Sequence, residues 1–319
     1  MSEGMLIETQ TVKPAVFVGL ASWDMIALLP GFPAPDGRLV AECIVEAGGG
    51  PAATAAVACA RLGVPACFIG AVGDDVYGDR ILAALRAETV DVSGVVRVLN
   101  TASCAALVLA DRTQATRALC PTLPPDFTLT AGSLQARMIT QAALIHADQI
   151  GYGKLAALGA ALPPLSIDAG NPIPDLDHRA ARLFVPTIAR LEAMFGPADP
   201  ATLLRRAAGA DWVVATAGAA GAYALDRTRE RLWHVPAFLP APCLSTLGAG
   251  DVFHGALVAG WMRGMGCAEA TAYAGITAAL SCRGIDGRSA IPDHDTVMRA
   301  LPAQRALTND ITELSHAAD

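Results

Sequence analysis

The sequence contains few aromatic residues and has no excess of positive charge. Phe, Trp and Tyr make up 5% of the 319 residues, whereas hydrophobic residues make up 53%. The formal net charge of −7 argues against a surface that binds nucleic acid or anionic lipid. No apolar run reaches the roughly 20 residues that span a bilayer, and the first twelve residues do not resemble a secretory signal. We therefore expect no nucleic-acid partner and no membrane partner.

Paired or clustered cysteines are also missing. None of the eight cysteines stands in a Cys-x-x-Cys motif or beside histidines at zinc-ligand spacing. This scatter is typical of reduced thiols, so we expect a cytoplasmic location. The cysteines are Cys43, Cys59, Cys67, Cys104, Cys120, Cys243, Cys267 and Cys282.

Short apolar runs recur along the chain and are separated by helical or loop segments. This pattern predicts βαβ units and a mostly parallel sheet in a doubly wound α/β fold. Two further stretches with β character, near 38–46 and 97–120, predict a small separate sheet. The apolar runs are 15–20, 66–70, 143–148, 165–168 and 212–216.

The most informative motif is Thr246-Leu247-Gly248-Ala249-Gly250-Asp251, which opens an apolar helical pattern. Two glycines before a helix N-terminus favour a nest of N–H groups that binds anions. The carboxylate of Asp251 would repel a phosphate, so we interpret it as a base that accepts the proton of an attacking hydroxyl. The alternative is an ordinary turn in which Asp251 caps the helix.

A second glycine cluster, Gly48-Gly49-Gly50, precedes Pro51 and an alanine-rich helix closed by Gly63. Asp24 follows the first predicted strand, where ligands of α/β sheets bind, and is a candidate for holding substrate hydroxyls. It could equally be a surface loop aspartate.

The same cluster matches the dinucleotide pattern G-x-G-x-x-A, which would indicate an NAD-dependent oxidoreductase. That alternative is disfavoured, because the fingerprint should follow the first buried strand and here follows a half-polar one.

Glycines also follow the strand predicted at 212–216. Thr216, Gly218 and Gly221 are placed where a nucleotide could approach the backbone, or where a hairpin could turn. Lys154 lacks the spacing of a phosphate loop. His254 is interpreted as a helix residue near the site rather than a metal ligand.

In their order along the chain, these motifs resemble the ribokinase-like sugar kinases of the PfkB family, from Ala15 to Asp293. The resemblance implies a ribokinase-like kinase domain over 1–319 with a lid formed by about 33–46 and 100–120. It implies ATP, Mg²⁺ and transfer of the γ-phosphoryl group to a sugar hydroxyl, so the expected enzyme is a phosphotransferase. The implied roles are a base at Asp251; an anion hole at Gly248, Ala249 and Gly250; substrate contacts at Asp24, Arg38, Gly49, Gly50 and Thr54; and nucleotide contacts at Thr216, Gly218 and Gly221.

The chain departs from the family pattern at three places. Thr54 replaces the usual asparagine, Ser245 replaces an aspartate, and the segment 184–187 lacks the carboxylate of the family's Asn-x-x-Glu motif. The metal ligands are therefore unknown. A non-catalytic sugar- or nucleotide-binding relative and a nucleoside kinase remain as alternatives.

Several motifs are similar to those of sulfofructose kinases, including Gly287-Arg288-Ser289. Arg38 would begin a lid strand, and Arg112 and Arg117 flank the other lid hairpin, so we hypothesise that Arg38 meets an anionic group on the substrate. The segment 147–150 lacks the arginine that those enzymes carry. We also expect a homodimer formed through the lid.

Overall fold

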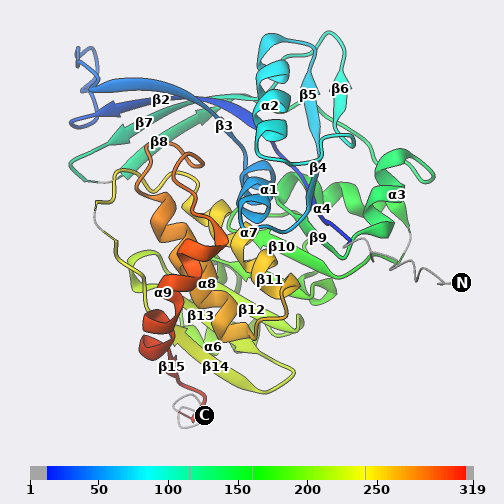
Figure 1. The fold of residues 1–319 in the computed structure, drawn as a ribbon, viewed down its shortest axis with the longest axis vertical. Helices are drawn as coiled ribbons and strands as arrows, with labels where there is room; N and C mark the ends of the chain where they lie inside the picture. The colour runs from blue at the N-terminus through cyan, green and yellow to red at the C-terminus, as the bar shows by residue number, and fades with distance from the viewer. Residues whose placement is uncertain (1–12, 115, 160, 241, 314–319) are drawn as a thin grey trace, which may run out of the picture.

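A computed structural model describes residues 13–114, 116–159, 161–240 and 242–313. Its centre is a nine-stranded sheet in the order β15-β14-β13-β12-β11-β10-β9-β1-β4 (Figure 1). Strands from β4 to β12 in this order pair in parallel, and the remaining pairs are antiparallel. The expected mostly parallel sheet is confirmed. The strands are β1 (Ala15–Val18), β4 (Ala66–Ile69), β9 (Leu144–Ala147), β10 (Leu165–Ala169), β11 (Leu183–Pro186), β12 (Trp212–Thr216), β13 (Ala222–Asp226), β14 (Arg231–Val235) and β15 (Asn309–Asp310).

Helices cover both faces of this sheet. Ala15 and Phe17 of β1 point into one buried cluster, and Val16 and Val18 point into the other. A strand buried on both faces must be apolar throughout, which is why it appears in the sequence as a continuous run. The first cluster lies under α1 (Pro51–Arg61), α2 (Val76–Ala87), α7 (Ala249–Met262), α8 (Cys267–Ser281) and α9 (His294–Leu307), and the second under α3 (Leu134–Gln141), α4 (Gln149–Leu155), α5 (Ile188–Phe195) and α6 (Pro200–Arg206).

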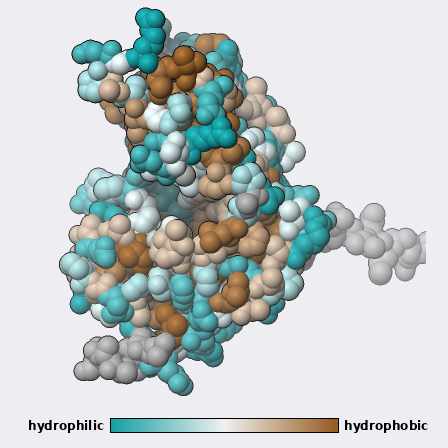
Figure 2. Space-filling model, turned by 90° about the vertical axis from the view of Figure 1, so that its left-hand side faces the viewer, coloured by the Kyte–Doolittle hydropathy of each residue, from teal (hydrophilic) through white to brown (hydrophobic). Residues whose placement is uncertain are grey.

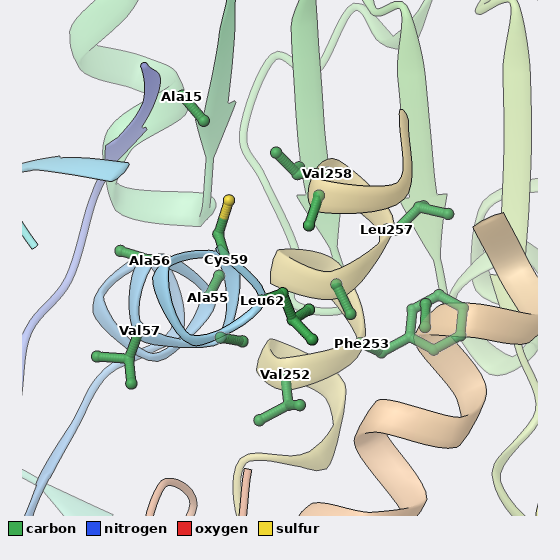
Figure 3. Close-up of a cluster of buried hydrophobic side chains, with 14 of the residues drawn as sticks. Ala15, Ala55, Ala56, Val57, Cys59, Leu62, Val252, Phe253, Leu257 and Val258 are labelled. Carbon is green, nitrogen blue, oxygen red and sulfur yellow. The ribbon is translucent and has the colours of Figure 1, made fainter. Parts of the chain in front are cut away.

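Small residues let α1 and α7 pack at close range. Figure 3 shows α1, with Ala55 and Cys59, beside α7, with Val252 and Val258. A Cβ at Gly255 would overlap the carbonyl oxygen of Ala55. The many alanines and glycines therefore allow α1 and α7 to lie close together. This packing fixes the position of the start of α7.

A separate four-stranded sheet, which we call the lid sheet, has the order β3-β2-β7-β8. Figure 2 shows the surface hollowed between the lid sheet and the rest of the molecule. Its strands are β2 (Ser22–Leu29), β3 (Cys43–Gly49), β7 (Ala105–Asp111) and β8 (Thr116–Pro121).

Two expectations about the lid were wrong in detail. The strand expected from Arg38 begins only at Cys43, because residues 30–42 form an exposed loop. Strand β2 was not expected at all, since Asp24 interrupts its apolar pattern, yet β2 pairs with both β3 and β7.

A two-stranded sheet, β5 (Ala71–Gly73) with β6 (Val96–Val98), lies beside α2. The Asp75 side chain caps α2 by accepting from Gly78 N at 2.8 Å. Within the described residues, no helix combines the length and the apolar character needed to cross a membrane.

Candidate active site

The candidate site lies at the carboxyl edge of the nine-stranded sheet, where the chain leaves β1 and β9 in opposite directions. Asp148, just after β9, marks this point. Its carboxylate accepts from Leu20 N at 2.8 Å, Ala52 N at 3.2 Å, and Ile150 N and Gly151 N at 2.9 Å. Burial raises its pKa to about 6. Asp148 therefore joins the end of β1 to the first turns of α1 and α4.

Asp251 stands in the first turn of α7, half-buried above this edge. Burial raises its pKa to about 7, with a further rise caused by the negative charge of Asp168. A carboxylate with a pKa near neutrality is well matched to general base catalysis. The role of Asp251 as a base stays a prediction.

The sequence placed both Gly248 and Gly250 before the helix, but the structure places only Gly248 there. Gly248 is the helix N-cap at φ 71°, and a Cβ there would meet Gly287 Cα at 2.8 Å. The need for glycine's conformational freedom therefore lies at Gly248, whereas Gly250 is already helical and exposed. Nothing lies within 4 Å of the Cβ position of Gly250, so this side of the turn faces open space.

The anion hole expected here would consist of the N–H groups of Gly248, Ala249 and Gly250. Ala249 N donates to Thr246 O at 3.3 Å, so this group is partly engaged in the turn. The first N–H groups of a helix have no partner within the helix, which leaves Gly250 and Asp251 as better donors to an anion.

A buried histidine and aspartate, which the sequence analysis did not bring together, lie next to Asp251. His254 Nε2 is 3.2 Å from Asp168 Oδ1 at the end of β10. The Asp168 carboxylate raises the pKa of His254, and its own pKa is held at about 2. His146, fully buried on β9, bonds Ser166 Oγ through Nδ1 at 3.0 Å, and burial lowers its pKa to about 3. An Asp at a strand end, as in 165–168, was the available sequence clue.

The first glycine loop packs against Asp24, which lies inside β2 rather than in a surface loop. Asp24 is 7% exposed and accepts from Ser22 Oγ at 2.6 Å. Burial raises its pKa. A Cβ at Gly49 would overlap the Asp24 carboxylate, and Gly50 adopts φ 89° against Leu20. Asp24, Gly49 and Gly50 are thus brought together as expected.

Arg288, 6% exposed, holds this loop from the other side of β3. It donates from Nη2 to Gly49 O at 2.7 Å and from Nε to Thr54 Oγ1 at 3.1 Å. Thr54 is 2% exposed, so its hydroxyl faces Arg288 rather than an open pocket. Arg288 also interacts electrostatically with both Asp24 and Asp251, which places the early and late motifs around one arginine.

The three lid arginines have different surroundings. Arg38 lies in the exposed loop before β3, outside the lid sheet, so its expected place at the start of a strand was wrong. Arg112 pairs with Glu42 at 2.6 Å within the lid. Arg117 on β8 crosses to the body and donates to Thr246 Oγ1 at 2.9 Å.

On the nucleotide side, Thr216 ends β12 and bridges Thr187 after β11. Gly221, at φ 94°, needs glycine because a Cβ would overlap Val235 O of its own chain. Gly218, at φ 57°, has nothing within 4 Å of its Cβ position and leaves space for a ligand.

A bound Mg²⁺ takes oxygen ligands in octahedral geometry. His146, Asp168 and His254 bring possible ligand atoms within 4.8 Å of one another, but two of them are imidazoles and Asp168 already pairs with His254. At the end of β11, Thr187 caps α5 and Arg190 follows in its first turn, which holds no acidic residue. Among the described residues, the group His146, Asp168 and His254 therefore does not suit Mg²⁺ as an all-protein site.

The chain is similar in sequence to known kinases. The chain is 26% identical to the ATP-dependent ribose-1-phosphate kinase of Halopiger xanaduensis over 291 residues, covering 88% of this chain and 95% of that protein. It is 37% identical to Fructokinase-1 of Oryza sativa subsp. japonica over 120 residues. This alignment covers 37% of this chain and 35% of the fructokinase.

Solved structures share the fold. Arabidopsis thaliana ribokinase, solved with ribose and ATP, superposes with a TM-score of 0.77 at 20% identity, covering 91% of this chain and 99% of that chain. A nucleoside kinase of Methanocaldococcus jannaschii gives a TM-score of 0.73 at 17% identity, covering 91% and 98%. The family model described as pfkB family carbohydrate kinase matches residues 13–294, and the chain therefore belongs to the pfkB family of carbohydrate kinases.

Proposed function

We propose that the protein is an ATP-dependent sugar kinase in which Asp251 is the general base. The observation that carries this proposal is the place of Asp251 behind the turn Gly248–Gly250, with a pKa raised to about 7. A hydroxyl oxygen of the sugar would attack the γ-phosphorus of ATP while its proton passes to Asp251. The bond from the γ-phosphorus to the bridging oxygen would break, and ADP would leave.

The residues around Asp251 would contact different parts of the two substrates. Asp24, Gly49 and Gly50 would hold the sugar, and Thr216, Gly218 and Gly221 would border the nucleotide. The N–H groups of the Gly248–Gly250 turn would receive the negative charge that develops on the phosphoryl oxygens. Magnesium would supply charge neutralisation on the ATP phosphates, and we assign no described residue to it.

The test is release of ADP from ATP with a panel of neutral sugars, acidic sugars and nucleosides, followed by identification of the phosphorylated product. Nucleosides belong in the panel because the fold is shared with nucleoside kinases. Tight ATP binding without turnover on any acceptor would instead support a non-catalytic binding protein.

The charge of the substrate can be tested at Arg38. If Arg38 meets an anionic group, Arg38→Ala should raise KM for an acidic sugar by roughly 10–100-fold, because charge-assisted bonds contribute about 1.5–3 kcal/mol. Equal changes for acidic and neutral sugars would contradict this role.

We also propose a homodimer through the lid sheet and a cytoplasmic location. Ile44 and Leu107 are 70% and 53% exposed. They lie on one face of the lid sheet, because their partners on β2, Ala27 and Met25, are two residues apart. Ile44→Lys should shift a dimer to monomer in analytical ultracentrifugation. All eight cysteines are free, which supports a reducing compartment.

A further inference from the structure

Three carboxylates converge at the carboxyl edge of the nine-stranded sheet. Asp148 follows β9, Asp168 lies near the end of β10, and Asp251 lies in the first turn of α7. Burial raises the pKa of Asp251, and the negative charges of Asp168 and Asp148 raise it further. Buried like charges oppose one another's ionisation, so this edge needs a positive group if Asp251 is to be ionised when the substrate is bound.

The side chain of His254 is placed to supply this positive charge. It lies three residues after Asp251 on α7, and residues three apart are neighbours on the surface of a helix. Its Nε2 is 3.2 Å from Asp168 Oδ1, and the two residues are 6% and 4% exposed. Burial lowers the pKa of His254, but the charge of Asp168 and the hydrogen bond to it outweigh burial, so the pKa is raised. This contact therefore favours the imidazolium form.

The other cationic side chains near Asp251 are bound elsewhere. Arg117 of β8 bonds to the turn before α7, and Arg288 bonds to the first glycine loop and to α1. Both interact electrostatically with Asp251 from outside the sheet edge. His146 on β9 lies beside the ring of His254, but burial lowers its pKa to about 3 and keeps it neutral. Among these groups, His254 is the one that both contacts a neighbouring carboxylate and belongs to the helix of the base.

We propose that His254 is a positioning residue that, as an imidazolium bound to Asp168, keeps Asp251 ionised and able to accept the hydroxyl proton. The proposal rests on the kinase function proposed above. His254 moves no proton in this role: the hydroxyl proton goes to Asp251, and the imidazolium keeps its own. Burial raises the pKa of Asp251, and the positive charge of His254 limits this rise.

The test is the pH dependence of kcat/KM in the wild type and in His254→Gln, measured as ADP release from pH 5 to 10. Glutamine keeps a polar side chain but carries no charge, so the pKa of Asp251 should rise and the acid limb should move to higher pH. A move of about one pH unit lowers kcat/KM roughly tenfold at pH values below the limb. Near pH 9, where Asp251 is ionised in both proteins, the two values should differ less than about threefold.

His146→Gln is the matched control, because His146 is a buried histidine of the same region that carries no charge to lose. Its acid limb should stay at the wild-type pH, whatever the change does to the free energy of unfolding in urea. An equal loss of kcat/KM at every pH in His254→Gln would show that His254 only supports the fold, and would overturn the proposal. An acid limb that does not move would overturn it as well.

The charge of His254 can also be measured in the wild type, so the proposal does not depend on a variant that folds. In an NMR titration, the ring of His254 is identified by its contact with the ring of His146, whose centroid is 5.4 Å away. We expect an imidazolium at pH 7, and a neutral ring at this pH would overturn the proposal. A wild type that consumes no ATP with any acceptor would instead refute the kinase function, whereas an active wild type with a neutral His254 refutes only this inference.

Discussion

Each of two glycine-rich loops precedes a helix, α1 or α7. The two loops differ in what lies next to their glycines, where another residue would carry a side chain. In the loop before α1, a Cβ at Gly48 would overlap Arg288 and one at Gly49 would overlap Asp24, so the protein's own side chains fill the space. In the turn that opens α7, a Cβ at Gly248 would meet Gly287 Cα at 2.8 Å, whereas one at Gly250, in the first helical turn, would meet nothing within 4 Å. The first loop is therefore filled by the protein's own side chains, whereas the second has open space at Gly250.

The two loops also differ in their carboxylates. Asp24 beside the first loop accepts a hydrogen bond from Ser22 Oγ at 2.6 Å. Within the described residues no hydrogen-bond donor contacts the side chain of Asp251, and burial raises its pKa to about 7. The first carboxylate is suited to hold a ligand, and the second is suited to accept a proton.

Asp251→Asn should produce the largest effect and would test the second loop alone. An amide cannot accept the hydroxyl proton, and loss of a general base typically lowers the rate by about 10²–10⁴-fold. We expect kcat to fall by this amount, measured by steady-state ADP release, while ATP affinity is nearly unchanged. Asp295→Asn, which also changes an acidic residue in the first turn of a helix, is the control. Wild-type turnover in Asp251→Asn would remove the proposed base.

Gly49→Ala should damage the first loop, because its new Cβ would overlap the Asp24 carboxylate. Overpacking of this kind costs about 1–3 kcal/mol, so we expect a lower free energy of unfolding in urea and a raised KM for the sugar. A variant with unchanged stability and KM would show that Asp24 can move aside at no cost.

The pH profile should test the carboxylate of the second loop. Because the pKa of Asp251 is raised to about 7, its ionised form is lost as pH falls through 7. The rate constant kcat/KM should therefore be about tenfold lower one pH unit below the pKa. Measurement of kcat/KM from pH 5 to 9 checks this, and a flat profile down to pH 5 would contradict it.

Gly250→Ala should have the smallest effect on the free protein. The new methyl group enters open space within a helical turn, and alanine in a helix is favoured over glycine by roughly 0.5–1 kcal/mol. We expect unchanged or slightly greater stability in urea, together with weaker ATP-dependent turnover. Full activity in Gly250→Val, which carries a bulkier side chain, would show that no phosphate approaches this turn.

Much of the architecture could be predicted from the sequence. Strands such as 15–18 and 212–216 are buried on both faces, so their apolar runs stand out, and the helix after Gly50 is bounded by Pro51 and Gly63. Strand β2 was missed because its pattern includes Asp24, whose burial depends on partners far along the chain. The pair of His254 with Asp168 was missed because the two residues are 86 positions apart and meet only at the sheet edge.

The sequence by itself determined the α/β fold, the two glycine loops and the carboxylates Asp24 and Asp251, because local periodicity and turn chemistry depend on near neighbours in the chain. The tertiary structure alone decided which glycines face protein and which face open space. It also decided that Arg288 and Asp148, far along the chain, hold the first glycine loop and the start of α1. It also decided the pKa of Asp251, since burial and the charge of Asp168 act through space. Contacts between residues hundreds of positions apart leave no periodic pattern in the sequence, so only the folded chain shows them.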